Sequence, residues 1–172
     1  MTNRDEVQPD RPVGEFVRDG RTVVMVTTAT GSQFSARPVT CVEASDGRLS
    51  FLVSTETDWV QHIEAGRSVV HVTSSDDAHG TYLALQGTAS VTNDPGERER
   101  LWSPVAKAWF SGPDDPSLAI LRFEVASGEY WDGPSTGIGK AVGLLRAVVS
   151  GNDASLGESG RVAPHESARA AS

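Results

Sequence analysis

The sequence has a single cysteine and lacks the motifs of several common site types. Cys41 is alone among 172 residues, which excludes an internal disulfide and a cysteine-based metal site. Because it stands in a strand-like run, we expect it to be a small buried side chain. The four histidines show no metal-ligand spacing with one another or with Cys41. The nucleophile motif G-x-S-x-G is absent too. We therefore expect no metal site, and no motif supports a hydrolase.

Basic residues are outnumbered by acidic ones, 15 against 23, so the formal net charge is −8. A negative surface repels phosphate backbones, and no basic stripe interrupts it. No apolar run reaches the roughly 20 residues that a membrane-spanning helix requires. The first ten residues are polar and acidic, whereas a secretory signal is basic and then apolar. These features predict a cytoplasmic protein that binds neither nucleic acid nor membranes.

Short β-branched runs between turn residues predict about six strands. They cover residues 21–28, 34–43, 49–54, 68–75, 81–93 and 118–132, the last as one strand or a pair. Pro38 cannot donate to a strand ladder, so its strand is expected to lie at an edge, to carry a bulge, or to turn its backbone toward a ligand. The strands follow one another like hairpins, without regular βαβ alternation. This order predicts a small, mainly antiparallel β-barrel with helices packed outside.

Helix signals stand between some of these strands. Thr57 is a candidate N-cap for a short helix that ends before Gly66. Asp94, Pro95 and Glu97 form a capping-box pattern, which predicts the start of a second helix.

Two further helices are expected toward the C-terminus. Ser103 can cap one that runs to Gly112, and the amphipathic stretch 138–151 predicts another. From residue 152 onward the composition is polar, with little to bury. We therefore predict one domain over residues 1–151 and a disordered tail over 152–172.

Two stretches suggest a binding site. In SARPVT (35–40), Arg37 places a permanent cation beside backbone groups that Pro38 leaves without ladder partners, which suits an anionic, planar ligand. A surface arginine on an edge strand remains the alternative. LWSPVAKAWF (101–110) holds two of the four tryptophans and a phenylalanine. This cluster suits a planar ligand, a second copy of the chain, or simple core packing.

The order of SARPVT, GRLSFLVS, TYLALQGTASV, LWSPVAKAWF, DDP and EYWDG resembles the pyridoxamine 5′-phosphate oxidase-like superfamily. Within it, the chain is most similar to the general stress protein 26 branch of flavin-binding split barrels. The resemblance covers Phe16 to Gly151. It implies a six-stranded antiparallel split β-barrel of the FMN-binding type, forming a homodimer with two FMN sites at the subunit interface.

The resemblance also implies an FMN-dependent oxidoreductase that acts on a small-molecule redox substrate. It carries Arg37 over to the cofactor, with the backbone of Val39 and Thr40 facing the flavin ring. The implied cofactor-binding residues are Arg37, Pro38, Val39, Thr40, Val53, Ser54, Thr55, Trp59, Tyr82, Gln86, Trp109 and Trp131. Trp109 and Trp131 belong to the region expected to meet the partner subunit. No protein general acid or base can be named.

One departure from the family pattern concerns the FMN phosphate. Where the family commonly has a basic residue, this chain has Asp58 and Trp59. The phosphate would then rely on Arg37, on the hydroxyls of Ser54, Thr55 and Thr57, and on amide groups at the start of the helix.

Other cofactors and functions therefore stay open. FAD, haem or a deazaflavin (coenzyme F420) is bound by relatives on the same fold, and some relatives carry no redox cofactor. The alternative functions are a deazaflavin-dependent reductase and a cofactor-binding stress protein without turnover.

Overall fold

The computed structural model describes residues 11–28, 33–45, 47–132 and 158–163. In these residues the chain forms eight strands, two α-helices and two 3₁₀ turns. They are β1 (Arg11–Pro12), η1 (Val13–Glu15), β2 (Thr22–Thr28), β3 (Phe34–Ser45), β4 (Arg48–Ser54), α1 (Asp58–Glu64), β5 (Val69–Asp76), β6 (Thr81–Thr92), α2 (Pro95–Leu101), η2 (Pro104–Ala108), β7 (Leu118–Asp132) and β8 (Glu158–Ala163).

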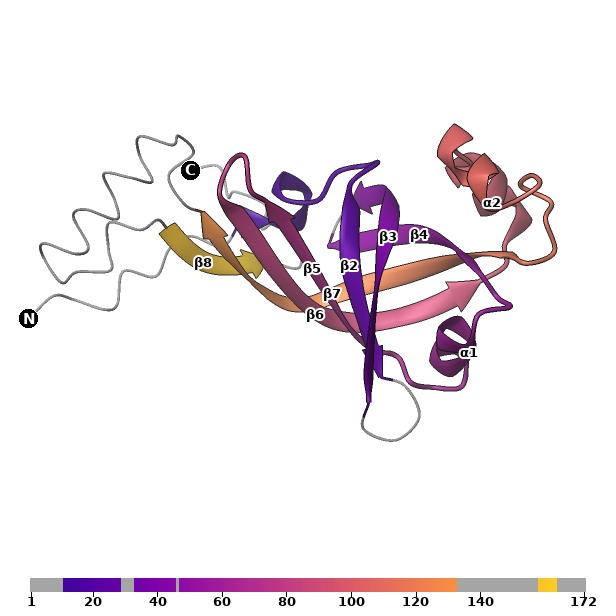
Figure 1. Cartoon of the computed structure of the whole chain (residues 1–172), viewed down its shortest axis with the longest axis horizontal. Coiled ribbons are helices and arrows are strands. Elements are labelled where there is room, and N and C mark those ends of the chain that lie inside the picture. The colour runs from indigo at the N-terminus through magenta and orange to yellow at the C-terminus, as the bar shows by residue number, and fades with distance from the viewer. Residues whose placement is uncertain (1–10, 29–32, 46, 133–157, 164–172) are drawn as a thin grey trace, which may run out of the picture.

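Six of the strands close into a barrel (Figure 1). They pair in the order β7-β4-β3-β2-β5-β6, every pair is antiparallel, and β6 pairs back onto β7. The long strand β7 is continuous, so it forms one strand rather than a pair. The predicted mainly β split barrel with peripheral helices is confirmed.

Alternation of side chains along each strand separates a core from an outer face. In β2, Val23 and Met25 are buried, while Thr22 and Val24 point outward. The inner faces of the other strands supply the rest of the core, including Leu49, Phe51, Val70, Val72, Leu85, Leu121 and Phe123. Cys41 is fully buried among them, as expected. Helix α1 adds Val60 and Ile63 to the same core.

The helix predictions are partly confirmed. Asp94 caps α2, because its carboxylate accepts a hydrogen bond from the amide of Glu97 at 2.8 Å. Thr57 occupies the N-cap of α1, but its hydroxyl donates to the carbonyl of Ser54 at 2.8 Å instead of capping the helix. The segment after Ser103 is only a 3₁₀ turn that ends at Ala108. The predicted helix 138–151 lies outside the described residues.

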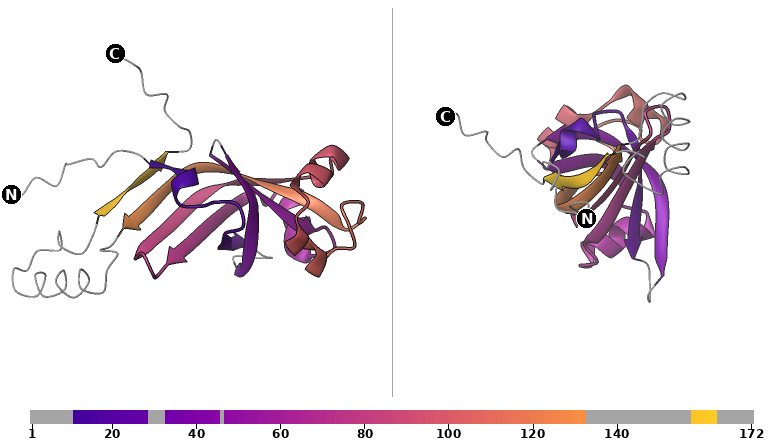
Figure 2. Two further views of the ribbon diagram at one scale, coloured as in Figure 1. Left: turned by 90° about the horizontal axis from the view of Figure 1, so that it is seen from above. Right: turned by 90° about the vertical axis from the view of Figure 1, so that its left-hand side faces the viewer.

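The predicted disordered tail is wrong at residues 158–163, which form strand β8. β8 pairs with the end of β7 and, in parallel, with β1, so the first and last of the described strands lie side by side (Figure 2). It occupies the edge of β7 beyond the stretch that pairs with β4. Val162 joins the core at 4% exposure. Gly160 lies so close to the Tyr130 ring that an added Cβ would come within 2.7 Å of its hydroxyl. A single apolar residue in a polar stretch was too weak a signal to predict this strand.

In the described part of the chain, no helix is long and apolar enough to cross a membrane.

Candidate functional site

The first half of β3 forms a free edge of the barrel. Residues 34–40 pair with β2 on one side, whereas pairing with β4 begins only at Cys41 and shifts register before Glu43. Pro38 lies in this stretch and is exposed. Of the three alternatives for the strand of Pro38, the edge is confirmed for residues 34–40, while the register shift lies further along the strand, between Cys41 and Glu43. Between 34 and 40 the side of β3 away from β2 has no neighbouring strand among the described residues, so backbone groups there can face a ligand.

Arg37 lies on this edge and is held in one orientation. Its guanidinium donates to the Thr27 hydroxyl at 3.0 Å and to the Ser35 carbonyl at 3.0 Å. It also stacks over Trp59 of α1, with 4.5 Å between the guanidinium carbon and the ring centroid. No ion pair among the described residues involves Arg37. Half-buried, it has a pKa lowered by desolvation and stays charged at neutral pH. An oriented cation that has no carboxylate partner in the described part of the chain is a candidate for binding an anion.

The loop before α1 is fixed by its own hydrogen bonds. The hydroxyl of Thr55 donates to the Ser117 carbonyl at 3.3 Å, and that of Thr57 to Ser54, so both hydroxyl protons are engaged. Ser54 differs, because its hydroxyl oxygen accepts from the amide of Glu56 at 3.3 Å and its proton is left to donate. Of the three hydroxyls expected at a phosphate, the structure favours Ser54.

Three other predicted site residues shape the wall of the barrel. The side chains of Val39 and Val53 pack against the core. Their backbone groups point toward the neighbouring strands β2 and β7, because Cys41 and Thr55, two residues further along, bond to those sides. The hydroxyl of Thr40 bonds to that of Thr22 at 3.2 Å across the strands.

Tyr82, Gln86 and Trp131 lie together on the outer face of β6 and β7. Tyr82 stands directly opposite Trp131 in the register, and both rings are substantially exposed, at 46% and 43%. Gln86 stands between His71 of β5 and Ser127 of β7. Trp109 is separate, at the end of η2, and is 71% exposed.

These two groups of residues are apart within one chain. Arg37 and Trp59 contact each other on the inner side of β3, whereas Tyr82, Gln86 and Trp131 lie on the outer face. Strand β6 is also three strands away from β3, or about 14 Å at the usual spacing. A single chain therefore does not bring all the predicted residues into one site.

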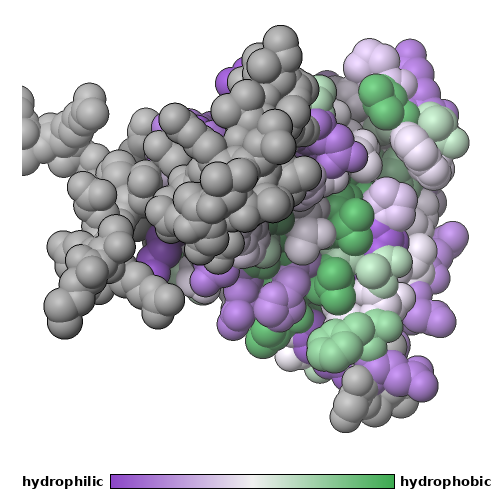
Figure 3. All heavy atoms as spheres, turned by 60° about the vertical axis from the view of Figure 1, so that its left-hand side comes forward, coloured by the Kyte–Doolittle hydropathy of each residue, from purple (hydrophilic) through white to green (hydrophobic). Residues whose placement is uncertain are grey.

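The outer face of this side of the barrel carries exposed apolar side chains. Val24, Phe34, Val69, Tyr82 and Trp131 are at least two-fifths exposed, and alternation places all five on the outside of neighbouring strands. Figure 3 shows hydrophobic side chains at the surface among polar ones. Exposed apolar area of this kind marks interaction surfaces.

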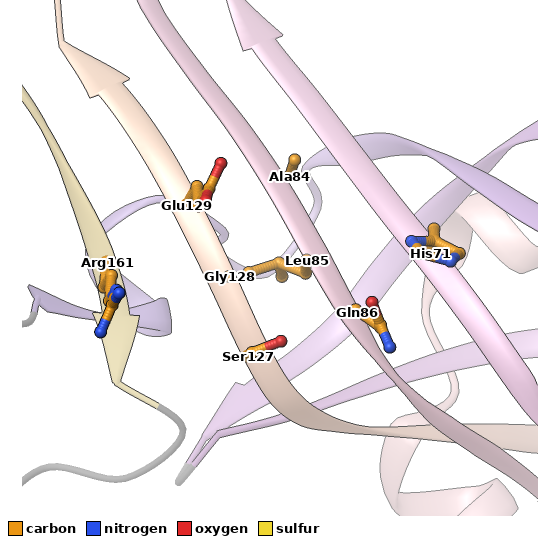
Figure 4. A pocket seen from close by; sticks show the side chains of 8 residues that line it. All are labelled: His71, Ala84, Leu85, Gln86, Ser127, Gly128, Glu129 and Arg161. Atoms are coloured by element: carbon orange, nitrogen blue, oxygen red, sulfur yellow. The ribbon is translucent and has the colours of Figure 1, made fainter.

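Two cavities were not predicted from the sequence. One, of about 280 Å³, lies on the outer face beside Gln86 and is lined by side chains of β5, β6, β7 and β8 (Figure 4). The alternation of side chains along the strands could have predicted His71 and Ser127 on the same face as Gln86. No sequence pattern predicted that Arg161 of β8 would line this cavity. The other, of about 380 Å³, lies beside the N-terminal segment. Its polar groups are largely paired, since Arg11 bonds to Glu15 and Asp132.

The closed barrel with a free, arginine-bearing edge defines a split-barrel protein. The family described as "Pyridoxamine 5'-phosphate oxidase like" matches residues 8–155, and the chain belongs to this family. Its general stress protein branch is supported by a curated relative, general stress protein 26 of Bacillus subtilis (strain 168), which is 34% identical over 74 residues. That match covers 41% of this chain and 52% of the relative, so the chain spans about half of the relative's length.

Solved structures agree with this assignment. A proposed general stress protein 26 from Jannaschia sp. CCS1 has a TM-score of 0.65 and 27% identity, covering 84% of this chain and 91% of that one. The general stress FMN/FAD binding protein of Xanthomonas citri has a TM-score of 0.60 and 28% identity, covering 69% and 84%. General stress protein 26 of Bacillus anthracis str. Sterne, at 19% identity, shares the fold with a TM-score of 0.61 over 69% of this chain and 89% of that one.

Proposed function

We propose that this chain is an FMN-binding oxidoreductase of the cytoplasm that works as a homodimer on a small-molecule redox substrate. The observation that carries the proposal is Arg37, a half-buried cation oriented by Thr27 and Trp59 at a strand edge, with no counter-ion among the residues that the structure describes. The name of the X. citri relative, an FMN/FAD binding protein at 28% identity, supports a flavin as the ligand.

The residues present fit the phosphate end of FMN. The guanidinium of Arg37 would bind the phosphate, and the Ser54 hydroxyl can donate to it. Asp58, exposed in the first turn of α1, opposes an anion there, which makes the site weaker than one with a second cation. Trp59 does not replace that cation but keeps the Arg37 guanidinium in place.

The free edge of β3 fits the polar rim of a flavin ring. Backbone groups of Pro38 and Thr40 stand on the side of the strand that no neighbour covers in the described part of the chain, whereas those of Val39 point toward β2. When bound, the flavin supplies the hydride or electron transfer, and the chain supplies position and charge. We assign no general acid or base to the protein.

A second copy would complete this site. Tyr82, Gln86 and Trp131 cannot reach Arg37 within one chain, but they can face the Arg37 edge of a partner. The apolar outer face that bears Tyr82 and Trp131 is the surface such a partner would cover. The separation of the two residue groups therefore supports a dimer with cofactor sites between the subunits.

Absorption spectroscopy of the purified protein tests the proposal. We expect a yellow protein whose oxidised-flavin spectrum bleaches when NAD(P)H is added without oxygen and returns with air. A bound flavin that NAD(P)H and other donors do not reduce would favour the cofactor-binding stress protein without turnover. A deazaflavin spectrum would favour the deazaflavin-dependent reductase, and FAD released on denaturation would replace FMN as the cofactor.

A further inference from the structure

The turn that leads into β7 is built around one of the two carboxylates in its DDP stretch. One oxygen of Asp115 accepts the amide and the hydroxyl of Ser111, both at 2.9 Å. The other accepts the amide of Ser117 at 2.9 Å and its hydroxyl at 2.7 Å. Hydrogen bonds from these two serines hold the pKa of Asp115 well below its usual range, so it is ionised at neutral pH. The exposed side chain of Asp114 makes no hydrogen bond or ion pair in the described part of the chain.

Arg98 of α2 binds the backbone of the same turn. Its guanidinium donates to the carbonyl of Asp115 at 3.2 Å and to that of Leu118 at 3.1 Å. The amide of Leu118 also donates to the Asp115 carbonyl, at 3.1 Å. Because both the side chain and the carbonyl of Asp115 are bonded, the turn has little freedom, and the carbonyl of Ser117 is held in one direction.

The Ser117 carbonyl holds the loop before α1. It accepts the amide of Thr55 at 2.8 Å and the Thr55 hydroxyl at 3.3 Å. The Thr55 carbonyl accepts from the side chain of Gln61 on α1 at 3.1 Å. Thr55 directly follows Ser54, whose hydroxyl is the one that the proposed function assigns to the FMN phosphate. A continuous chain of contacts therefore links Asp115 to Ser54.

We propose that Asp115 is a positioning residue for the phosphate end of the cofactor site, because it fixes the direction in which the Ser54 hydroxyl donates. This inference rests on the proposed function. Asp115 acts through Ser117 and Thr55 and not by its charge, since a carboxylate near a phosphate opposes binding. The two effects have opposite signs: loss of the charge alone would tighten FMN, whereas loss of the positioning weakens it. The direction of the change therefore tells them apart.

Titration of apoprotein with FMN and riboflavin tests the proposal in Asp115→Ala. We expect FMN to bind about three- to tenfold more weakly and riboflavin to change little, because a displaced donor loses part of its hydrogen bond to the phosphate. Asp114→Ala is the matched control. It removes the same side chain and the same charge one residue earlier, without removing a hydrogen bond, so it should not lower the FMN-to-riboflavin affinity ratio.

A milder pair of variants keeps the carboxylate, in case Asp115→Ala fails to fold. Ser117→Ala removes one of the four hydrogen bonds, at the oxygen on the Thr55 side, and should lower the FMN-to-riboflavin ratio about twofold. Ser111→Ala removes one hydrogen bond at the other oxygen and should leave the ratio closer to that of the parent.

Two further readouts separate positioning from a general loss of stability. In Ser54→Ala, which lacks the proposed donor, adding Asp115→Ala should not lower the ratio further, because both changes remove the same contact. In flavin-free Asp115→Ala, the Thr55 amide should exchange its hydrogen faster by NMR, since its acceptor is no longer held.

The role of Asp115 is overturned if Asp115→Ala leaves the ratio unchanged or raises it, if Asp114→Ala lowers it equally, or if the falls add in the double variant. Unchanged exchange at Thr55 would overturn the route through Ser117. A parent protein that binds FMN no more tightly than riboflavin would instead refute the proposed phosphate site itself. A parent that prefers FMN, with the same preference in Asp115→Ala, would refute the role of Asp115 alone.

Discussion

Removing the charge of Arg37 should weaken FMN selectively. The sharper variant is Arg37→Gln, because Arg37→Ala would leave the hydroxyl of Thr27, only 2% exposed, without its partner. Glutamine retains an N–H donor and part of the aliphatic side chain, but it has no positive charge. It therefore separates the effect on the phosphate from an effect on folding.

The size of the effect follows from the surroundings of Arg37. A hydrogen bond to a charged group contributes about 1.5–3 kcal/mol. Because Arg37 is half-buried and solvent screens part of its charge, we expect the lower part of that range, about 1.5–2 kcal/mol. That corresponds to roughly 10- to 30-fold weaker FMN binding. Riboflavin has the same ring without the phosphate, so its affinity should change little.

The assay is a fluorescence titration of apoprotein with FMN and riboflavin at low and high salt. The FMN-to-riboflavin affinity ratio should fall in Arg37→Gln, and the difference should shrink as salt rises. Lys107→Gln, which removes an exposed cation on η2, should leave the ratio unchanged. The reasoning is refuted if Arg37→Gln binds FMN as tightly as the parent, or if FMN and riboflavin weaken equally.

Other changes probe the rest of the account. Asp58→Asn should tighten the binding of FMN but not that of riboflavin, since it removes a negative charge near the FMN phosphate. An unchanged FMN-to-riboflavin affinity ratio in the same titration would contradict this. Deleting residues 152–172 should lower the melting temperature, because it removes the buried Val162, whose burial contributes on the order of 1.5–3 kcal/mol; an unchanged melting curve would mean that β8 does not form. Gly160→Ala should cost about 1–3 kcal/mol of stability through its contact with Tyr130, while Gly14→Ala, with open space around it, should cost much less. Burial raises the pKa of the Cys41 thiol to about 11, so a disulfide reagent at pH 8 should modify it only after unfolding. Between the ordinary thiol pKa of 9.0 and about 11, only the unfolded chain ionises at Cys41, so the free energy of unfolding falls as pH rises through that window. In Cys41→Ala the free energy of unfolding should fall less steeply over the same window.

The barrel was predictable because its signals are local. Alternating β-branched runs and turn residues specify the strands, and Pro38 marks the free edge of β3. Asp94 marked the start of α2 for the same reason, since capping depends on residues three apart. β8 was missed because its stability comes from Gly160 under Tyr130 and from pairing with both β1 and β7, which are distant in sequence.

The candidate site was predictable only in part. An arginine before a proline in a strand indicated an oriented cation at an edge, and the structure has one. The stacking of Arg37 on Trp59 could not be predicted from the sequence, because it depends on where α1 packs against the barrel. For the same reason Trp59→Lys would not restore the family's second cation. It would remove the ring under Arg37 and place a like charge beside it.

Native mass spectrometry of the purified protein after addition of FMN tests the central claim most directly, because one spectrum reports both chain number and cofactor number. We predict a main species of two chains with two FMN molecules, and a lower FMN occupancy without loss of the dimer in Arg37→Gln at the same FMN concentration. A monomer that holds FMN would contradict the shared site, and a dimer that takes up no FMN would contradict the cofactor.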